Sequence, residues 1–203
     1  MSEAHDISSL TPAAIGPGRL ILVVGPSGAG KDTLLGLAKS ACTEDRNIIF
    51  PRRVVTREAS ASEDNEELSS AAFREALARS DFALHWEAHG HLYALRRTID
   101  DDIRAGRTVV INASRTVIDA VRQLYANVTV VSITAPPNVL AERIAMRERR
   151  SDRRATNRLG RAVDVISASD FTILNVGRPE DHARRLVEIV KADFVKWFAD
   201  MSP

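Results

Sequence analysis

Cysteine, long apolar runs and net charge are all scarce in this chain of 203 residues. The single cysteine, Cys42, allows no internal disulfide and no cysteine-cluster zinc site, which is typical of a reducing compartment. No apolar run approaches the roughly 18 residues that a membrane helix needs. The net charge of +1 gives no global reason to expect nucleic acid or an acidic membrane surface as a partner. We therefore expect a cytoplasmic protein that binds neither nucleic acid nor membrane.

The composition fits one folded domain. The sequence is 44% apolar and 27% charged, and a chain of this length buries about 70% of its unfolded surface on folding. Residues 1–18 contain two prolines and no apolar run of signal-peptide length, so we interpret them as a flexible N-terminal tail. Residues 19–203 are interpreted as a single domain, as a monomer or a homodimer.

Short apolar runs alternate with amphipathic segments along the chain. Strands are predicted at 20–24, 52–55, 108–112, 128–133 and 171–175. Helix boundaries are indicated by N-capping serines (Ser69 or Ser70, and Ser114), by prolines at helix starts (Pro137 and Pro179) and by a closing glycine (Gly106). This alternation predicts an α/β fold with a central parallel sheet covered by helices.

Residues 82–93 follow a different pattern. Phe82, Leu84 and Trp86 alternate with other residues, and Gly90 favours a turn into a second short strand. We predict a small antiparallel insert with Trp86 in its core. The same segment contains three histidines: His85, His89 and His91. Because the turn interrupts the strand between them and no fourth ligand is evident, polar contacts lining a pocket are favoured over a zinc site.

One segment matches the phosphate-binding pattern G-x-x-x-x-G-K-[ST] at every position except the last. It follows the apolar run 20–24 and leads into a helix-forming stretch, which is the setting that the motif requires. Glycines let backbone N–H groups converge on phosphate oxygens, while Lys31 and the helix N-terminus add positive charge. The predicted nucleotide-binding residues are Gly25, Pro26, Ser27, Gly28, Ala29, Gly30, Lys31, Asp32 and Thr33.

The mismatched last position is Asp32, a carboxylate where the pattern has a hydroxyl residue. Asn112 ends the apolar strand at 108–112, where many enzymes with this loop place an aspartate that orients magnesium. We therefore predict that Asp32 takes over part of the metal positioning, with Thr33 as the neighbouring hydroxyl. The alternative is an acidic residue that only complements the helix dipole.

Residues 142–161 hold eight arginines against three acidic residues, a local surplus of +5. A solvated helix face or a nucleic-acid surface has a similar composition. Beside a phosphate loop, however, movable cations suit phosphoryl transfer because they neutralise charge on the transferred group. We predict an arginine-rich lid at about 147–158, with Lys31, Arg147, Arg158 and Arg161 as the catalytic residues.

The loop, the arginine-rich segment and the sequence Val-Val-Thr-Arg at 54–57 together resemble the guanylate-kinase-like branch of nucleoside monophosphate kinases, over about residues 19–190. The resemblance implies a three-layer P-loop kinase sandwich with an acceptor-binding region at about 56–95. It also implies that Arg57 holds the acceptor's phosphate. Ser60 stands where that branch has a second arginine, and Leu84 where it has a glutamate that reads guanine. Since leucine accepts no hydrogen bond, GMP is a poor acceptor candidate.

Four segments resemble, more narrowly, the ribose 1,5-bisphosphate phosphokinases of bacterial phosphonate breakdown. They are GPSGAGKD, VVTREASASEDN, FALHWEAHGHLY and VINASR, and that family also carries aspartate after the lysine. The resemblance implies transfer of the γ-phosphoryl of ATP to ribose 1,5-bisphosphate, giving 5-phospho-α-D-ribose 1-diphosphate and ADP, with ATP and Mg²⁺ required. The implied substrate-binding residues are Arg57, Glu66, Tyr93, Asn112 and Arg115. For Glu66 an exposed acidic loop, and for Tyr93 simple packing, are the alternatives.

Two other functions stay open. One is a kinase for a different small acceptor, such as a nucleoside monophosphate, and the other is a non-catalytic interaction module of the guanylate-kinase type. Gly30, Lys31 and the lid arginines favour an enzyme, because a binding scaffold has no need of them. We therefore expect an ATP-dependent phosphotransferase that acts on a small phosphorylated sugar.

Overall fold

The computed structural model describes residues 13–57, 64–88, 90–150 and 169–192. In chain order the elements are β1 (Arg19–Val24), α1 (Lys31–Ala41), β2 (Ile48–Ile49), β3 (Arg53–Val55), β4 (Asn65–Glu67), α2 (Ser70–Ala78), β5 (Phe82–Ala88), β6 (His91–Arg96), α3 (Thr98–Arg104), β7 (Thr108–Asn112), the 3-10 helix η1 (Arg115–Val117), α4 (Ile118–Leu124), β8 (Val128–Thr134), α5 (Pro137–Arg150), β9 (Phe171–Leu174) and α6 (Pro179–Lys191).

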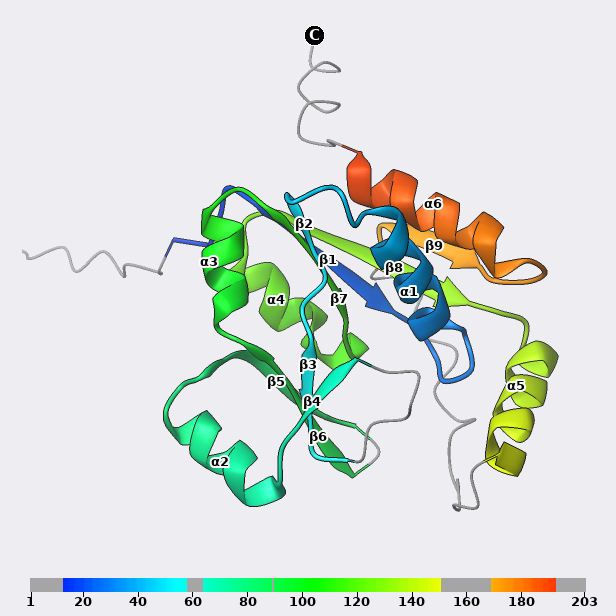
Figure 1. Cartoon of the computed structure of the whole chain (residues 1–203), viewed down its shortest axis with the longest axis horizontal. Helices are drawn as coiled ribbons and strands as arrows, with labels where there is room; N and C mark the ends of the chain where they lie inside the picture. Colours follow the sequence, from blue (N-terminus) through cyan, green and yellow to red (C-terminus); the bar gives the residue numbers. More distant parts are fainter. Residues whose placement is uncertain (1–12, 58–63, 89, 151–168, 193–203) are drawn as a thin grey trace, which may run out of the picture.

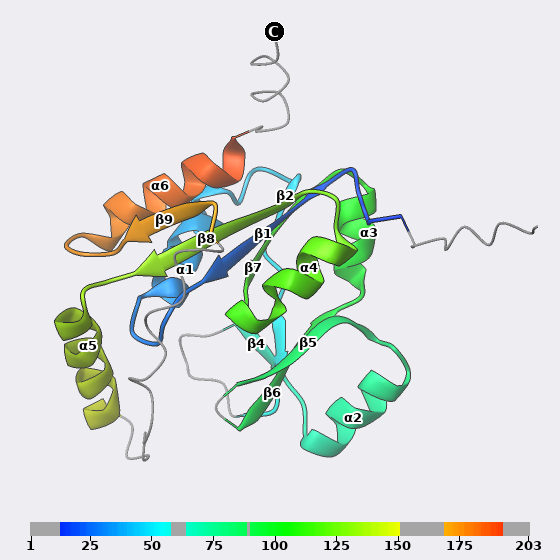
Figure 2. The same ribbon diagram turned by 180° about the vertical axis from the view of Figure 1, so that it is seen from behind.

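The central sheet has five strands in the order β2-β7-β1-β8-β9, and every neighbouring pair is parallel. Successive side chains of β1 point to opposite faces. Ile21 and Val23 pack in one core with residues of α1 and α6. Leu20 and Leu22 pack in the other core with residues of α3 and α4. The helices therefore cover both faces of the sheet, as the two opposite views show, and the predicted three-layer α/β fold is confirmed (Figures 1 and 2).

A second sheet, with the order β4-β3-β6-β5, forms the predicted insert. β5 and β6 are antiparallel, and Gly90 lies between them with φ 73°. On one face of this sheet, Leu84 and Trp86 pack in the same core as Leu20, Leu22 and residues of α3 and α4. This confirms Trp86 as a core residue. The other face packs against α2, where the rings of Phe73 and Phe82 lie 4.8 Å apart.

The prediction for 52–55 is wrong in one respect. This segment was expected in the central parallel sheet, but β3 belongs to the insert and pairs with β4 and β6. The edge of the central sheet is taken by β2, which pairs with β7 through Ile48 and Ile49 alone. Two residues are too few to give a periodic pattern, so the sequence offered no signal for this strand.

The predicted helix boundaries are confirmed. Ser69 caps α2 by accepting a hydrogen bond from the amide of Ala72 at 3.1 Å, and Ser114 caps η1. Pro137 and Pro179 are the first residues of α5 and α6. Each boundary rests on local chemistry that the sequence carries by itself.

Residues 13–18 belong to the predicted flexible tail, but in the structure they are bound to the domain. The amide of Ile15 donates to the carbonyl of Leu124 at 2.8 Å, and the amide of Gly18 donates to Ile103 at 2.8 Å. Arg19 then donates to the carbonyls of Val190 and Ala192 at the end of α6. The folded domain therefore begins before the predicted boundary.

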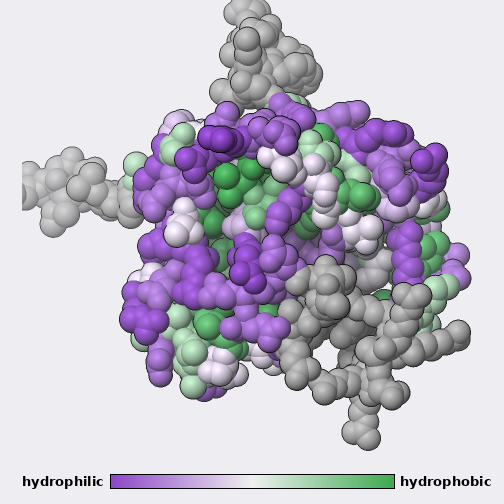
Figure 3. Space-filling model, viewed as in Figure 1, coloured by the Kyte–Doolittle hydropathy of each residue, from purple (hydrophilic) through white to green (hydrophobic). Residues whose placement is uncertain are grey.

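The described surface on the face shown in Figure 3 is mostly hydrophilic, with small hydrophobic areas between the hydrophilic ones. Within the described residues, no helix is long and apolar enough to cross a membrane. Cys42 is buried in the core between α1 and α6, and burial raises the pKa of its thiol.

Candidate active site

The loop between β1 and α1 has the conformation that the glycine pattern predicts. Gly25 and Gly30 have φ values of 146° and 86°, which disfavour residues with a side chain. A Cβ atom at Gly25 would also meet the carbonyl of Ile133, and one at Gly30 would meet the side-chain amide of Asn175. Both the backbone conformation and the available space therefore require glycine here.

Lys31 lies over this loop. Its Nζ donates to the carbonyl oxygens of Gly25 at 2.8 Å and Pro26 at 3.0 Å. Gly30 caps α1 without a side-chain hydrogen bond, so the first amides of the helix have no side-chain acceptor from the cap residue. A helix N-terminus of this kind, with an ammonium group beside it, is suited to bind phosphate oxygens.

Two residues that are distant in the sequence, Asn175 and Arg143, hold the loop through hydrogen bonds to its backbone. The side-chain amide of Asn175, which is buried, donates to the carbonyl of Ala29 at 2.8 Å. Arg143 of α5 donates to the carbonyl of Asn175 at 3.1 Å and approaches that of Gly28 at 3.5 Å. These contacts fix the loop against β9 and α5. A small cavity beside them is lined by Gly30, Thr33, Arg143, Asn175, Gly177 and Pro179.

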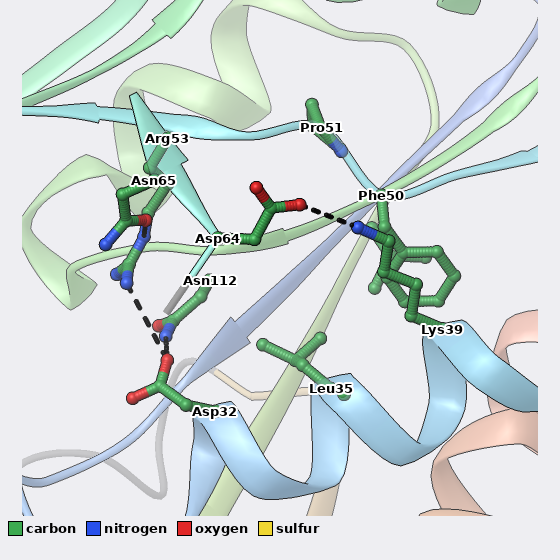
Figure 4. A pocket seen from close by; sticks show the side chains of 11 residues that line it. Asp32, Leu35, Lys39, Phe50, Pro51, Arg53, Asp64, Asn65 and Asn112 are labelled. Carbon is green, nitrogen blue, oxygen red and sulfur yellow. Dashed lines mark hydrogen bonds and ion pairs between the residues drawn. The ribbon is translucent and has the colours of Figure 1, made fainter. Parts of the chain in front are cut away.

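Asp32 and Asn112 meet at the end of β7. The amide of Asn112 donates to the carboxylate of Asp32 at 2.7 Å, and Arg53 Nη2 lies 3.7 Å from the same oxygen (Figure 4). The Asp32 side chain is 44% exposed, whereas that of Arg53 is only 15% exposed. The carboxylate is therefore held in place from the protein side and remains open to solvent.

This carboxylate borders a second cavity between α1 and the insert (Figure 4). Its apolar lining comes from Leu35, Phe50 and Val110. Among the described residues, the lining consists of Asp32, Leu35, Gly36, Lys39, Phe50, Pro51, Arg53, Asp64, Asn65, Val110 and Asn112. Cations, carboxylates and amides thus surround an apolar floor, as a pocket for a polar small molecule requires.

A second carboxylate, Asp64, lies on the opposite side of this cavity from Asp32 in Figure 4. It pairs with Lys39 Nζ at 3.0 Å and with Arg52 Nε at 2.8 Å. Arg52 also donates to the backbone carbonyl of Asn65 at 2.8 Å. The hydrogen bond from Lys39 is the main cause that lowers the pKa of Asp64, so this carboxylate is ionised near neutral pH.

Of the five predicted substrate-binding residues, which all belong to the described part of the chain, Asn112 alone lines the cavity. Glu66 pairs with Arg96, which lowers the pKa of the Glu66 carboxyl. It lies on the strand face opposite to its neighbour Asn65, which does line the cavity. Tyr93 is 8% exposed and stacks on Trp86 with the ring centroids 5.7 Å apart, so it packs in the core. Tyr93 therefore packs, as its alternative states, whereas Glu66 forms an ion pair on strand β4 and does not lie in an exposed acidic loop.

Arg57 and Arg115 are half-buried residues that follow the ends of β3 and β7. Thr56 fixes the chain before Arg57, because its amide donates to the carbonyl of Leu92 at 3.1 Å and its hydroxyl accepts from the amide of the same residue at 2.9 Å. Neither arginine is among the described residues that line the two cavities.

Several predicted residues cannot be placed. Arg147 belongs to α5, whereas Ser60, His89, Arg158 and Arg161 lie outside the described residues. Neither His85 nor His91 lines the cavity below α1, and His85 is exposed on β5. Within the described ranges no three or more His, Cys, Asp or Glu side chains gather as a metal site.

Sequence reasoning missed four residues that the structure brings to these cavities: Lys39, Arg53, Asp64 and Asn175. Arg53 precedes the apolar pair Val54-Val55, and a charged first residue of a strand is a weak signal at most. Asn175 directly follows the apolar strand β9, the kind of position at which polar functional groups gather in parallel sheets.

A phosphate loop at the end of the first strand, five parallel strands and a cavity beside the loop define a P-loop kinase. The likeness to solved structures supports that fold: guanylate kinase from Anaplasma phagocytophilum has a TM-score of 0.61 at 20% identity, covering 89% of this chain and 87% of that one. The kinase CysC from Mycobacterium tuberculosis, an APS kinase, has a TM-score of 0.52 at 13% identity, with coverages of 87% and 99%.

Curated relatives identify the family. Ribose 1,5-bisphosphate phosphokinase PhnN from Bradyrhizobium diazoefficiens is 59% identical over 192 residues, covering 94% of this chain and 97% of the relative. The protein of the same name from Rhodopseudomonas palustris is 59% identical over 185 residues, with coverages of 91% and 94%. No family model matches the chain. The chain belongs to the ribose 1,5-bisphosphate phosphokinase family.

Proposed function

We propose that the protein transfers the γ-phosphoryl group of ATP to ribose 1,5-bisphosphate, giving 5-phospho-α-D-ribose 1-diphosphate and ADP. Family membership supports the reaction. The observation in the structure that carries it is the position of one carboxylate, Asp32, between the phosphate loop and a polar cavity. ATP in the loop and the phosphoryl acceptor in the cavity would thus be close to each other at Asp32.

The loop and Lys31 are the proposed site of the β- and γ-phosphates of ATP. The amides at the start of α1 and the Lys31 ammonium supply the donors. The small cavity beside Gly30, Thr33 and Arg143 opens next to this loop, and we assign it to the remainder of the nucleotide.

Magnesium is proposed at Asp32, with the hydroxyl of Thr33 beside it. Oxygen donors suit this hard cation, and the Asp32 carboxylate is both exposed and oriented by Asn112, so the residues present fit it. When bound there, the ion would neutralise charge on the β- and γ-phosphates during transfer. Asn112 orients the carboxylate, and the guanidinium of Arg53 faces it with a positive charge.

On the acceptor side, Arg57, Asn112 and Arg115 are proposed to hold phosphate and sugar oxygens. The acceptor oxygen belongs to a phosphate that is already largely ionised near neutral pH, so it needs little help from a general base. The bond from this oxygen to the γ-phosphorus forms while the bond to the β-phosphate oxygen breaks, and ADP leaves. We assign Arg147, Arg158 and Arg161 to the charge on the transferred group, on the basis of the arginine surplus of their segment.

Release of ADP in a coupled assay with a panel of acceptors tests this function. We expect turnover with ribose 1,5-bisphosphate and little with GMP, because Leu84 lies buried in the core and offers no hydrogen-bond acceptor for guanine. Strong turnover with GMP and none with ribose 1,5-bisphosphate would overturn the proposal. A protein that binds no ATP would instead be an interaction module.

A further inference from the structure

The carboxylate of Asp64 lies between two cationic side chains at the cavity between α1 and the insert, which we take as the acceptor cavity. The carboxylate of Asp64 pairs with Lys39 from α1 at 3.0 Å and with Arg52 at 2.8 Å. Asp64 and Lys39 both line the cavity, and Arg52 reaches Asp64 without lining it. The position of the carboxylate therefore marks a place where these elements bind negative charge.

The cluster of Lys39, Arg52 and Asp64 is separated from Asp32, next to the phosphate loop, by a distance that could span a sugar ring. Lys39 follows Asp32 by seven residues on α1, and both side chains line the same cavity. Two helical turns correspond to a rise of about 10 Å. The same cavity is lined by the amides of Asn65 and Asn112, with Asn112 beside Asp32, and the apolar side chain of Leu35 lies between Asp32 and Lys39 (Figure 4). A sugar ring fits such a mixture of amide and apolar contacts, and it would leave one charged group near each end.

We propose that Lys39 and Arg52 bind the second phosphate of the acceptor, the one that does not react, in the position that the Asp64 carboxylate takes in the structure. The inference rests on the proposed function, since it requires an acceptor with phosphates on both sides of a ribose. It makes Lys39 and Arg52 the residues that distinguish a bisphosphate from a monophosphate.

The exchange of one anion for another needs little rearrangement of the protein. The side chains of Lys39, Arg52 and Asp64 are 51%, 57% and 57% exposed, and ion pairs as exposed as these contribute little to stability. A phosphate carries more charge than a carboxylate and has three acceptor oxygens. Arg52 is also held by the carbonyl of Asn65, so its guanidinium stays in position when the partner changes.

Asp64 has a second consequence in this arrangement, because it competes with the phosphate for the two cations. Removing its charge is expected to strengthen phosphate binding, whereas removing either cation weakens it. If the cluster only tied α1 to the insert as a strut, loss of any member would act in the same direction. The sign of the Asp64 effect therefore separates a binding site from a strut.

The experiment measures inhibition by ribose 5-phosphate, which carries the second phosphate but lacks the reacting one. Its inhibition constant against ribose 1,5-bisphosphate is determined for the wild type and for Lys39→Gln, Arg52→Gln and Asp64→Asn. Arg185→Gln serves as the matched control, because Arg185 is a similarly exposed arginine paired with Glu188 on α6, outside both cavities.

We expect the inhibition constant to rise roughly tenfold in Lys39→Gln and Arg52→Gln, as for the loss of one charge-assisted contact. It should fall in Asp64→Asn and stay unchanged in Arg185→Gln, and the KM for ATP should not change in any variant. The inference is wrong if Asp64→Asn weakens inhibition like the cation variants, if the cation variants leave it unchanged, or if ribose 5-phosphate does not inhibit the wild type. Failure of the proposed function gives a different result, namely a wild type that releases no ADP with ribose 1,5-bisphosphate.

Discussion

Replacement of Asp32 by asparagine separates the two interpretations of this residue. The amide has the same shape as the carboxylate, so it can keep the hydrogen bond that Asn112 donates at 2.7 Å. It removes the negative charge that faces Arg53 at 3.7 Å and the proposed metal. The variant thus changes charge with little change in geometry.

The expected losses of magnesium affinity and of folding stability in Asp32→Asn follow from the proposed metal contact and from the exposure of the carboxylate. A hydrogen bond or ligand contact to a charged group contributes about 1.5–3 kcal/mol, which corresponds to a loss of about 10- to 100-fold in apparent magnesium affinity. The effect on folding should be small. Asp32 is 44% exposed, and an acidic residue in the first turn of a helix contributes about 0.3–1 kcal/mol through the helix dipole.

The assay is the rate of ADP release as a function of magnesium concentration at saturating ATP, with thermal unfolding measured in parallel. Asp181→Asn is the matched control, since Asp181 also lies in the first turn of a helix, α6, and lines neither cavity. We expect both variants to lose a similar, small amount of stability and only Asp32→Asn to need a higher magnesium concentration for half-maximal turnover.

Unchanged turnover and unchanged magnesium dependence in Asp32→Asn would refute the metal role. Asp32 would then be an acidic residue that complements the dipole of α1, and its contact with Asn112 would be structural. Equal kinetic losses in Asp181→Asn would refute it as well, because Asp181 is outside the site.

Three other predictions concern single residues. Gly30→Ala should abolish ATP binding and lower the melting temperature, because the new Cβ clashes with the side chain of Asn175 and the φ of 86° at this position disfavours alanine. Measurements of nucleotide binding and thermal unfolding check this prediction. Glu66→Gln should destabilise the fold by roughly 1 kcal/mol and leave the KM for the acceptor unchanged, because its carboxylate binds an arginine on the face away from the cavity; urea unfolding and acceptor kinetics check both. Tyr125→Phe should cost about 1–2 kcal/mol at neutral pH and remove an alkaline loss of stability, because the hydroxyl donates to the buried Asp100 at 2.6 Å.

The sign of the alkaline effect follows from the pKa of Tyr125, which burial and the bond to Asp100 raise above its usual value. The neutral hydroxyl is the form that the fold stabilises, so its contribution is complete below the unfolded-state pKa of about 10 and is lost as the pH rises above it. Equal alkaline slopes in the wild type and Tyr125→Phe would contradict this. For the other two variants, ATP binding by Gly30→Ala or a raised acceptor KM in Glu66→Gln would do so.

The loop and the meeting of Asp32 with Asn112 could be predicted because both depend on local rules. The glycine spacing and the preceding apolar strand specify the loop. The carboxyl ends of parallel strands lie at one edge of the sheet, so a residue that ends β7 approaches the start of α1. No knowledge of long-range pairing was needed for either.

The cavity residues could not be predicted because they depend on strand register. β3 and β4 pair in parallel with Arg53 opposite Asn65, and this pairing places both on the cavity face. Glu66, one residue further, points to the other face and binds Arg96. A shift of one residue exchanges the two faces, and nothing in the local sequence sets the register of two strands separated by a loop.

The most direct test of the central claim is phosphorus NMR of wild-type protein mixed with ATP, Mg²⁺ and ribose 1,5-bisphosphate. Transfer to the phosphate on C1 predicts that its single resonance is replaced by the two coupled resonances of a sugar diphosphate, in equal amount to the ADP formed, while the phosphate on C5 keeps its signal. Appearance of ADP and inorganic phosphate with an unchanged C1 resonance, or a diphosphate formed at C5, would contradict the account.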